Sequence, residues 1–391
     1  MLLSLALIMM IGAFMGWGCK KLRLPALLGM IVTGIVLGPY TLDLIDESIL
    51  GISSELRKIA LIIILTRAGL SLDMNDLKRV GRPAVLMCFL PACFEILGMV
   101  ILAPKLLGIS VLESAVMGAV VGAVSPAVIV PKMLKLMEDG YGTGQSIPQM
   151  ILAAASVDDV FVIVMFSVFT GLVKSGDVSA YEFVRIPVSI ALGIAAGLCI
   201  GYIMEKYFKK VHIRDTEKVI IMLSVSFILV TFEDAYSYMI PFSALIAIMC
   251  MGIAIQQKRM AVAERLSVKF SKLWVAAEVM LFVLVGATVD LSYAASAGIS
   301  AVILIFGVLV FRMAGVFLCV AKTSLTMKER LFCMIAYMPK ATVQAAIGGI
   351  PLSMGLACGR IVLVVAVLAI MITAPLGAFL IDLTYRKLLE R

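Results

Sequence analysis

Long apolar runs repeated along the whole chain limit its fold more than any other feature of the sequence. About thirteen runs are candidate spans, most of them long enough for a helix to cross ~30 Å of hydrocarbon at ~1.5 Å of rise per residue. Inside hydrocarbon every backbone N–H and C=O needs a partner within the protein, which favours helices for runs of this length. The sequence therefore predicts an all-α polytopic membrane protein with spans at about residues 2–19, 25–38, 57–72, 84–103, 112–136, 147–173, 186–204, 219–233, 239–255, 273–289, 299–320, 331–352 and 361–383.

Charged residues are scarce and lie mostly between the runs. Hydrophobic residues make up 62% of the chain and charged residues 15%, so the expected helices are apolar around most of their surface. The net charge of +8 comes from short Lys/Arg clusters in alternate loops, which is the pattern of cytoplasmic loops and not of a nucleic-acid surface. We therefore expect a multi-pass protein of the cell (inner) membrane, embedded in the lipid bilayer, with its N-terminus outside and its C-terminus cytoplasmic, that binds no nucleic acid.

Two pairs of similar segments indicate an inverted repeat. Residues 65–73 and 284–291 end the third and tenth runs with related sequences, and segments with Gly or Pro at 122–131 and 337–346 interrupt the fifth and twelfth runs. Seven runs separate the members of each pair, so the two halves must have opposite orientations in the membrane. Interrupted helices at matching positions are the best sequence indication of a transporter's binding site near the membrane midplane.

Five charged residues lie inside the apolar runs, near their middle. They are Glu95, Asp158, Asp159, Arg312 and Lys340. A single carboxylate at the centre of a membrane helix is unfavourable by roughly 2.5–3.5 kcal/mol, so two adjacent aspartates indicate a role with cations or protons. Three acids against two bases leave one carboxylate without a fixed partner. Because neighbours on a helix point in different directions, we expect one aspartate to take a structural partner while the other faces the ion.

Oxygen ligands for a small cation are available around these carboxylates. The hydroxyl groups of Ser125, Ser156 and Thr342 lie in or beside the interrupted runs, and the interruptions should free backbone carbonyls at residues 123–126 and 338–341. Such hard oxygen ligands suit an alkali cation. The spacing of the ligands does not rank Na⁺, Li⁺ and K⁺, because selectivity depends on cavity size and ligand number.

Several of these segments resemble a known family. The segment Ser156-Val-Asp-Asp159 resembles the double-aspartate signature of the electrogenic branch of the monovalent cation/proton antiporter superfamily. Residues 65–73 and 338–348 (Met-Pro-Lys-Ala-Thr-Val-Gln-Ala-Ala-Ile-Gly) are especially similar to its NHA-type sodium/proton antiporters, and the resemblance covers nearly the whole chain. It implies an inverted-repeat antiporter fold with two crossed, unwound helices. It also implies a homodimer in which Asp159 alternately binds the cation and protons, with Asp158 as its supporting neighbour.

The resemblance further implies a division into a scaffold, which forms the dimer, and a mobile core, which contains the crossed helices. The scaffold is expected at residues 1–72 (spans one to three) and 217–291 (spans eight to ten). The core is expected at residues 83–175 (spans four to six) and 295–386 (spans eleven to thirteen), and a linker helix at 182–210.

The resemblance also implies roles for the two basic residues inside the apolar runs, Arg312 and Lys340. Many electrogenic relatives have a lysine at the position of Arg312, whereas the NHA-type members have an arginine that pairs with a glutamate equivalent to Glu95. It therefore implies a Glu95–Arg312 ion pair in the core. A guanidinium does not release its proton in this pH range, so Arg312 is a poor proton carrier and the transport stoichiometry stays open. Lys340 is expected to compensate charge at the second interrupted helix.

These observations predict a secondary active sodium (or lithium)/proton antiporter that works by alternating access, with cation and protons competing for Asp159. The alternatives are a potassium/proton antiporter of the same superfamily, a sodium-coupled organic-solute carrier with the same inverted-repeat plan, and a cation channel. Neither Ser125 nor Ser156 has a histidine base nearby in the sequence, so we expect no enzymatic activity, and we expect no cofactor.

Overall fold

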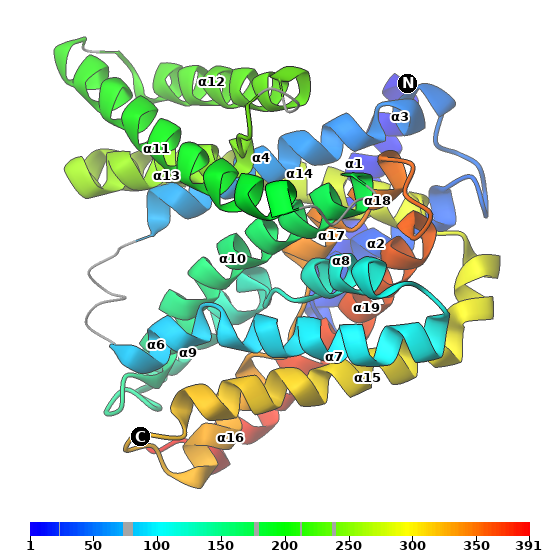
Figure 1. The fold of residues 1–391 in the computed structure, drawn as a ribbon. Coiled ribbons are helices and arrows are strands. Elements are labelled where there is room, and N and C mark those ends of the chain that lie inside the picture. Colours follow the sequence, from blue (N-terminus) through cyan, green and yellow to red (C-terminus); the bar gives the residue numbers. More distant parts are fainter. Residues whose placement is uncertain (23, 73–80, 176–179, 212, 237–239) are drawn as a thin grey trace. The chain divides into compact units, whose positions relative to one another are not determined.

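The computed structural model describes residues 1–22, 24–72, 81–175, 180–211, 213–236 and 240–391, except for the side chains of 156, 174–175, 180–187 and 291–297. Within these ranges all regular elements are helices (Figure 1). The helices are α1 (Leu2–Lys21), α2 (Ala26–Leu37), α3 (Glu47–Gly51), α4 (Ser53–Ser71), α6 (Arg82–Met87), α7 (Leu90–Leu107), α8 (Val111–Val121), α9 (Pro126–Asp139), α10 (Ile147–Ser175), α11 (Ala180–Lys210), α12 (Asp215–Tyr236), α13 (Ala244–Lys258), α14 (Met260–Ala287), α15 (Leu291–Val320), α16 (Met327–Ala336), α17 (Thr342–Ile347), α18 (Ile350–Ser353) and α19 (Gly359–Leu388).

The helices match the predicted spans. Among the described residues, nine segments are long and apolar enough to cross a membrane, and α2 and α13 are shorter apolar helices. The predicted runs at 57–72 and 331–352 correspond to α4 and to α16–α18. The prediction of an all-α polytopic membrane protein is therefore confirmed. The segments are Leu2–Lys21, Arg82–Leu107, Val111–Asp139, Ile147–Val173, Val188–Lys210, Asp215–Tyr236, Met260–Ala287, Gly298–Val320 and Gly359–Leu388.

Helix α14 begins earlier than the apolar run predicts, at Met260 and not near residue 273. Its first half is amphipathic, with Ala263, Leu266 and Phe270 buried and Glu264 exposed between them. This helical spacing of apolar residues produces a stable helix without a continuous apolar run. The start of α14 was missed for that reason.

Two of the predicted spans are interrupted near their middle. Residues 122–125, here called the first break, separate α8 from α9, and residues 337–341, the second break, separate α16 from α17. Pro126 occupies the first position of α9, where a missing N–H does no harm. Steric contact with the proline ring keeps the preceding residue, Ser125, out of the helical region, at φ −92° and ψ 112°.

Both interrupted spans begin with a helix N-terminal capping box. Ser110 and Glu113 form a capping box at the start of α8, and Thr326 and Glu329 form one at the start of α16. Each box satisfies backbone N–H groups that the first turn of a helix leaves without partners.

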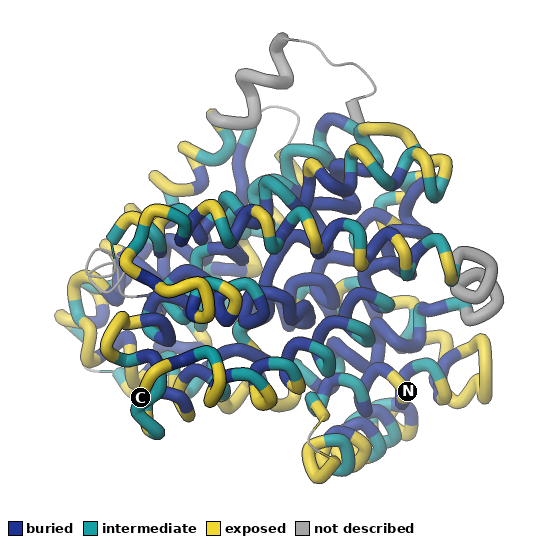
Figure 2. The backbone as a smooth tube through the Cα atoms, turned by 90° about the horizontal axis from the view of Figure 1, so that it is seen from below, coloured by how far each residue is buried: buried dark blue, intermediate teal, exposed yellow. Residues whose placement is uncertain are grey.

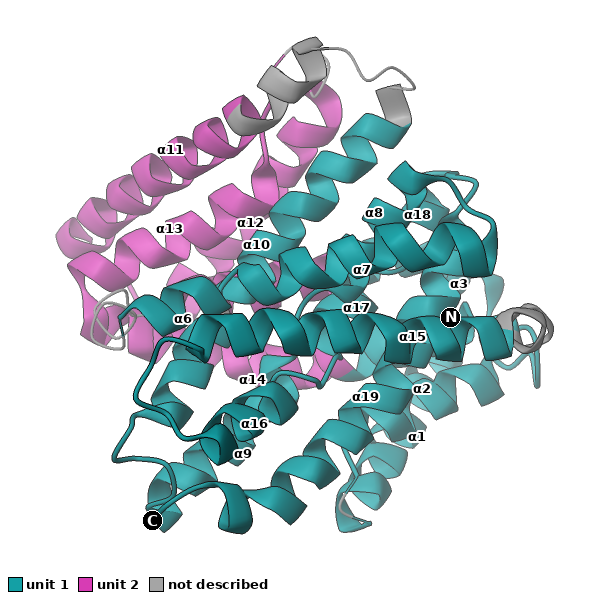
Figure 3. Ribbon diagram, turned by 60° about the horizontal axis from the view of Figure 1, so that its bottom comes forward, with its two compact units in different colours: residues 1–57, 76–173, 279–391 teal, residues 58–75, 174–278 magenta. Residues whose placement is uncertain are grey.

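The chain forms two compact units, coloured separately in Figure 3. Unit 1 contains residues Met1–Arg57, Asp76–Val173 and Val279–Arg391. In it α7 runs along α15, and small residues allow the close approach: the ring of Phe311 lies against Gly98, and Gly315 lies against the backbone of Pro91. Both interrupted spans belong to unit 1.

Unit 2 contains residues Lys58–Asn75 and Lys174–Glu278. Its closest helix pair is α11 and α13, where Gly193, Gly197 and Gly201 face the backbone of α13. A Cβ atom added at Gly197 would collide with the backbone of Ala247. Close backbone packing through small residues is a standard way to join helices in lipid.

Buried and exposed residues alternate along individual helices (Figure 2). Much of the exposed surface is apolar, as a lipid-facing surface requires. The buried residues, however, are not all apolar. Arg312, Tyr337 and Lys340 are among the largest side chains that are fully buried; Tyr337 and Lys340 belong to the second break, and Arg312 donates to the carbonyl of Tyr337.

Candidate ion-binding site

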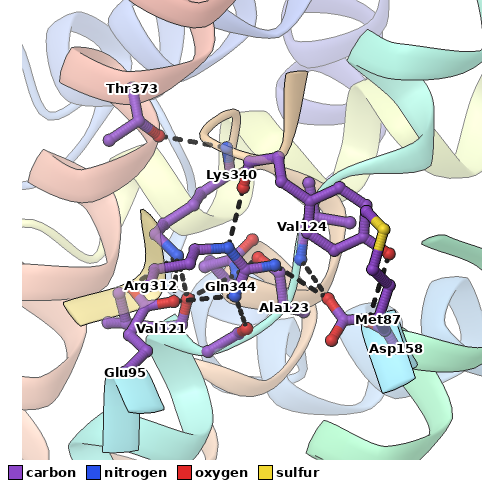
Figure 4. A network of polar contacts seen from close by, with 12 residues as sticks. Met87, Glu95, Val121, Ala123, Val124, Asp158, Arg312, Lys340, Gln344 and Thr373 are labelled. Carbon is purple, nitrogen blue, oxygen red and sulfur yellow. Dashed lines mark hydrogen bonds and ion pairs between the residues drawn. The ribbon is translucent and has the colours of Figure 1, made fainter. Parts of the chain in front are cut away.

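The two breaks of unit 1 are bonded directly to each other. The backbone N–H of Ser125 donates to the carbonyl oxygen of Pro339 at 2.8 Å. Because α8–α9 and α16–α17 are interrupted at this point, their unpaired peptide groups meet here. The breaks, together with the side chains of Glu95, Asp158, Arg312, Lys340 and Gln344 that bind them, are called the crossing below (Figure 4).

Arg312 of α15 is the centre of the crossing. Its Nη1 lies 2.8 Å from Glu95 Oε2 and its Nη2 lies 3.0 Å from Asp158 Oδ2. The same guanidinium donates through Nε to the carbonyl of Tyr337, at 2.7 Å, and through Nη1 to the carbonyl of Gly122. One side chain thus joins two carboxylates to both breaks. A planar group with five N–H donors is suited to this role, and lysine is not.

Lys340 lies in the second break and makes the second pair of charged contacts. Its Nζ lies 2.6 Å from Glu95 Oε1 and donates to the carbonyl of Val121 at 2.7 Å. Its backbone N–H donates to Thr373 Oγ1 of α19 at 3.0 Å. Glu95 therefore bridges Arg312 and Lys340, and all three side chains are at most 1% exposed.

Asp158 and Asp159 of α10 have different surroundings. Asp158 Oδ2 accepts from the backbone N–H of Val124 at 2.8 Å as well as from Arg312, so this carboxylate is bound to the first break. Asp159 is 9% exposed, and its Oδ1 has no hydrogen-bond partner among the described residues. The sequence predicted such a division between the two aspartates, and in the structure Asp158 is the one with the fixed contacts.

The formal charges of the crossing cancel without Asp159. Glu95 and Asp158 contribute two negative charges, and Arg312 and Lys340 contribute two positive charges. Asp159 adds a further negative charge beside this neutral group. An ionised carboxylate in a buried place is unfavourable unless a positive partner neutralises it.

Three predicted hydroxyl ligands are placed differently by the structure. Ser125 is 1% exposed, and its Oγ has no hydrogen-bond partner among the described residues. Thr342, at the start of α17, is 2% exposed. The side chain of Ser156 lies outside the described residues. The hydroxyl of Ser125 is therefore available to a ligand, and the ligand roles of Thr342 and Ser156 stay predictions.

The expectation that the breaks leave carbonyls free for a cation is wrong at several positions. The carbonyl of Ala123 accepts from Gln344 Nε2 at 2.8 Å, and the carbonyl of Pro339 accepts from Ser125. The carbonyl of Ala341 accepts from the N–H of Ala345 at 3.0 Å. Buried carbonyls without partners are unfavourable, so the protein satisfies them with its own donors.

Sequence reasoning missed three residues of the site: Gln344, Thr373 and Tyr337. Gln344 donates to two carbonyls around the first break, and Thr373 accepts from Lys340. The ring of Tyr337 lies 5.3 Å from the guanidinium of Arg312. Gln344 is part of the 338–348 string that carries the family resemblance, and a polar amide inside an apolar run was the signal that could have identified it.

Comparisons with known proteins agree with this architecture. Residues 5–386 match the family model "Sodium/hydrogen exchanger, transmembrane". The chain is 34% identical to sodium/hydrogen exchanger 9B2 of Mus musculus over 94% of its own length and 69% of the relative's, and 32% identical to sodium/hydrogen exchanger 9B1 of Homo sapiens over 94% and 73%. Its fold is similar to that of the sodium proton antiporter MjNhaP1 from Methanocaldococcus jannaschii, with a TM-score of 0.86 at 21% identity over 98% of this chain and 97% of that one.

A membrane-spanning helical protein with two interrupted helices bonded at a buried charged site is a secondary transporter by its architecture. The chain belongs to the sodium/hydrogen exchanger family. This membership confirms the predicted place in the monovalent cation/proton antiporter superfamily and the antiporter fold.

Proposed function

We propose that this chain is a secondary active sodium/proton antiporter in which Na⁺ or Li⁺ competes with protons for Asp159. The observation that carries the proposal is the surplus carboxylate of Asp159, which lies beside a group of charges that already cancel. Either a metal cation or a proton neutralises this carboxylate, and the two cannot occupy it together. Competition for one site is sufficient to couple their movements in opposite directions.

The cation's ligands are proposed to come from four side chains besides Asp159. Asp158 and Ser125 each have a buried oxygen without a hydrogen-bond partner among the described residues, namely Oδ1 and Oγ. Thr342 lies directly after the second break, and the hydroxyl of Ser156 completes the proposed set. Oxygen atoms of this kind replace the hydration shell of a small alkali cation.

Transport is proposed to follow alternating access. The occupied, neutralised site crosses as part of the core (residues 83–175 and 295–386), which moves against the scaffold (1–72 and 217–291), with the linker helix at 182–210 between them. An empty, ionised site is held back by a burial penalty of several kcal/mol. The N-terminus is proposed to lie outside and the C-terminus in the cytoplasm of the cell (inner) membrane, in a homodimer.

Glu95, Arg312 and Lys340 are proposed to compensate charge in every step. Arg312 keeps its proton and is held by four contacts, to two carboxylates and two carbonyls. It therefore stabilises the crossing and carries no transported proton.

Proton flux in sealed proteoliposomes with an inside-acid gradient tests the proposal. Na⁺, Li⁺ or K⁺ is added outside to the wild type, to Asp159→Asn, and to the control Asp43→Asn. Asp43 is exposed and has a φ of +51°, a conformation that asparagine adopts readily, so the control changes the charge of a loop and nothing else.

Dissipation of the gradient by Na⁺ or Li⁺ in the wild type and the control, but not in Asp159→Asn, is the expected result. Dissipation by K⁺ alone would favour the potassium/proton alternative. Wild-type flux in a folded Asp159→Asn variant would refute the role of Asp159. Repeating the assay with the membrane potential clamped determines whether exchange is electrogenic.

A further inference from the structure

Gln344 forms a bridge between the two interrupted spans. Its side chain, 1% exposed, projects from α17, and its Nε2 donates to the carbonyls of Val121, at 3.1 Å, and Ala123, at 2.8 Å (Figure 4). A carboxamide has two N–H donors, and here both are directed at the end of α8 and the first break. No charged group of the crossing makes this pair of contacts.

The contact with Ala123 leads directly to Asp158. The carbonyl of Ala123 and the N–H of Val124 belong to the same planar peptide unit, so fixing the direction of one fixes the direction of the other. That N–H donates to Asp158 Oδ2 at 2.8 Å. Gln344 and Asp158 therefore hold opposite edges of one peptide unit.

The contact with Val121 connects Gln344 to the charged group. The carbonyl of Val121 also accepts from Lys340 Nζ at 2.7 Å, and Lys340 in turn lies 2.6 Å from Glu95. Lys340 and Gln344 stand on the same short stretch of chain, the second break and α17. Hydrogen bonds from one charged and one neutral side chain thus hold this stretch against the end of α8 and the first break.

Gln344 leaves its own oxygen without a partner. Its buried Oε1 has no hydrogen bond among the described residues, which is unfavourable for stability. Only the two donated hydrogen bonds of Gln344 offset this cost, and both bind backbone carbonyls beside the proposed ion site.

We propose that Gln344 is a positioning residue of the ion site. By holding the peptide unit of Ala123 and Val124, it keeps Asp158 directed at Val124 and Arg312, and so leaves Asp159 as the carboxylate that binds the cargo. This inference rests on the proposed antiport at Asp159 and adds a residue that sets the affinity of that site.

The test compares Na⁺-dependent proton flux in Gln344→Met, Gln344→Asn and the control Gln257→Met. Methionine matches the length of glutamine without its donors, and asparagine keeps the amide on a chain too short to reach both carbonyls. Gln257 is an exposed residue of α13. We expect both Gln344 variants to raise the KM for Na⁺ by about fivefold to tenfold, the factor that corresponds to losing one buried hydrogen bond, with the maximum rate within about twofold of wild type.

A second measurement distinguishes positioning from a general structural role. Direct binding of ²²Na⁺ is measured for Gln344→Met, Asp158→Ala and the double variant, since alanine removes the oxygen that accepts from Val124 whereas asparagine would keep one. If Gln344 acts through Asp158, the double variant binds Na⁺ about as weakly as Asp158→Ala alone, because the two changes interrupt one chain of contacts. If Gln344 stabilises the fold in general, the two losses of affinity multiply, and the proposal is wrong.

The flux assay has further outcomes that would overturn the inference. A wild-type KM in Gln344→Asn, or a reduced maximum rate with an unchanged KM in either variant, contradicts a positioning role. These results are distinguishable from failure of the proposed function, because in that case the wild type itself shows no cation-dependent flux.

Discussion

The crossing in unit 1 and the α11–α13 pair in unit 2 hold helices together by opposite means. In the crossing, the backbones of two interrupted spans are joined by charged and amide side chains. Between α11 and α13 the glycines at 193, 197 and 201 bring two continuous helices into backbone contact, and the charged contacts of this pair lie at one end of it, where Arg259 meets Glu205 and Lys258 lies over the ring of Tyr202.

This difference in packing indicates that the two regions have different roles. Lipid supplies no hydrophobic force between helices, so close packing of small residues is a sufficient way to join them. A buried group of charges is a weak source of stability, because desolvation offsets most of the attraction. A protein that uses glycine packing in one unit and buried charges in the other therefore has a reason besides stability for the charges.

Removal of one charge from the crossing should have the largest effect. Glu95→Gln leaves Lys340 buried without a carboxylate and is expected to reduce the free energy of unfolding by about 3–5 kcal/mol. Denaturant titration in detergent measures this change, with Glu264→Gln on the exposed face of α14 as the matched control. The double variant Glu95→Gln/Lys340→Met should lose less than the single one. A larger loss in the double variant would contradict the view that an uncompensated charge is the cause.

Filling the contact between α11 and α13 should have the next largest effect. Gly197→Ala places a methyl group against the backbone of Ala247 and is expected to destabilise the protein by about 1–3 kcal/mol. Gly171→Ala in α10 is the control, because a Cβ there meets nothing within 4 Å and alanine favours the helix by up to about 1 kcal/mol. Equal shifts of the thermal midpoint in the two variants would show that the glycines do not set the packing.

Loss of a single neutral bond in the crossing should have a smaller effect. Thr373→Val removes the acceptor of the Lys340 N–H and is expected to lower stability by about 1 kcal/mol, whereas Thr373→Ser, which keeps the hydroxyl, should remain near wild type. Thermal unfolding of the three proteins under one condition is the measurement. If serine destabilises as much as valine, the methyl group and not the hydrogen bond matters at this position.

Removal of an exposed carboxylate should have the smallest effect on stability, and Asp46 provides such a case for comparison with the two buried regions. Hydrogen bonds from the Ser48 hydroxyl and backbone N–H lower the pKa of Asp46, the N-cap of α3, to about 2. The stabilisation is therefore fully present above the ordinary value near 3.8 and is lost as the pH falls through about 2. The difference in thermal midpoint between wild type and Asp46→Ala should be small at neutral pH and decrease between pH 4 and pH 2. A difference that grows on acidification would contradict this assignment.

The sequence predicted the parts of this molecule that depend on local chemistry. Pro126 and the Gly-containing segment before it predict the first break, and the placement of Asp158 and Asp159 inside an apolar run predicts that their surroundings must be polar. The order of the apolar runs was enough to predict that the spans are helices and where along the chain they lie.

The contacts that depend on the meeting of distant segments could not be predicted. Whether the carbonyl of Ala123 is free or bound is decided by Gln344, more than 200 positions later in the chain. The start of α14 was missed for a different reason: its buried residues recur at helical spacing, which the sequence contains, but they do not form the continuous apolar run that marks the other spans. Three-dimensional proximity, and not residue type, decides only the first case.

The capping boxes at Ser110 and Thr326 have a consequence for membrane depth. Each box fixes where its helix starts, and α8 and α16 then run for 11 and 10 residues before the break. At ~1.5 Å per residue these helices are about 15–17 Å long, which is half of the ~30 Å hydrocarbon layer. Because seven predicted runs separate the two interrupted spans, we expect α8 and α16 to enter from opposite faces of the membrane and to end near its middle. An inserted or deleted residue between cap and break would shift the inner end of that helix by ~1.5 Å and turn it by about 100°. The geometry of the proposed ion site therefore depends on the lengths of these two helices.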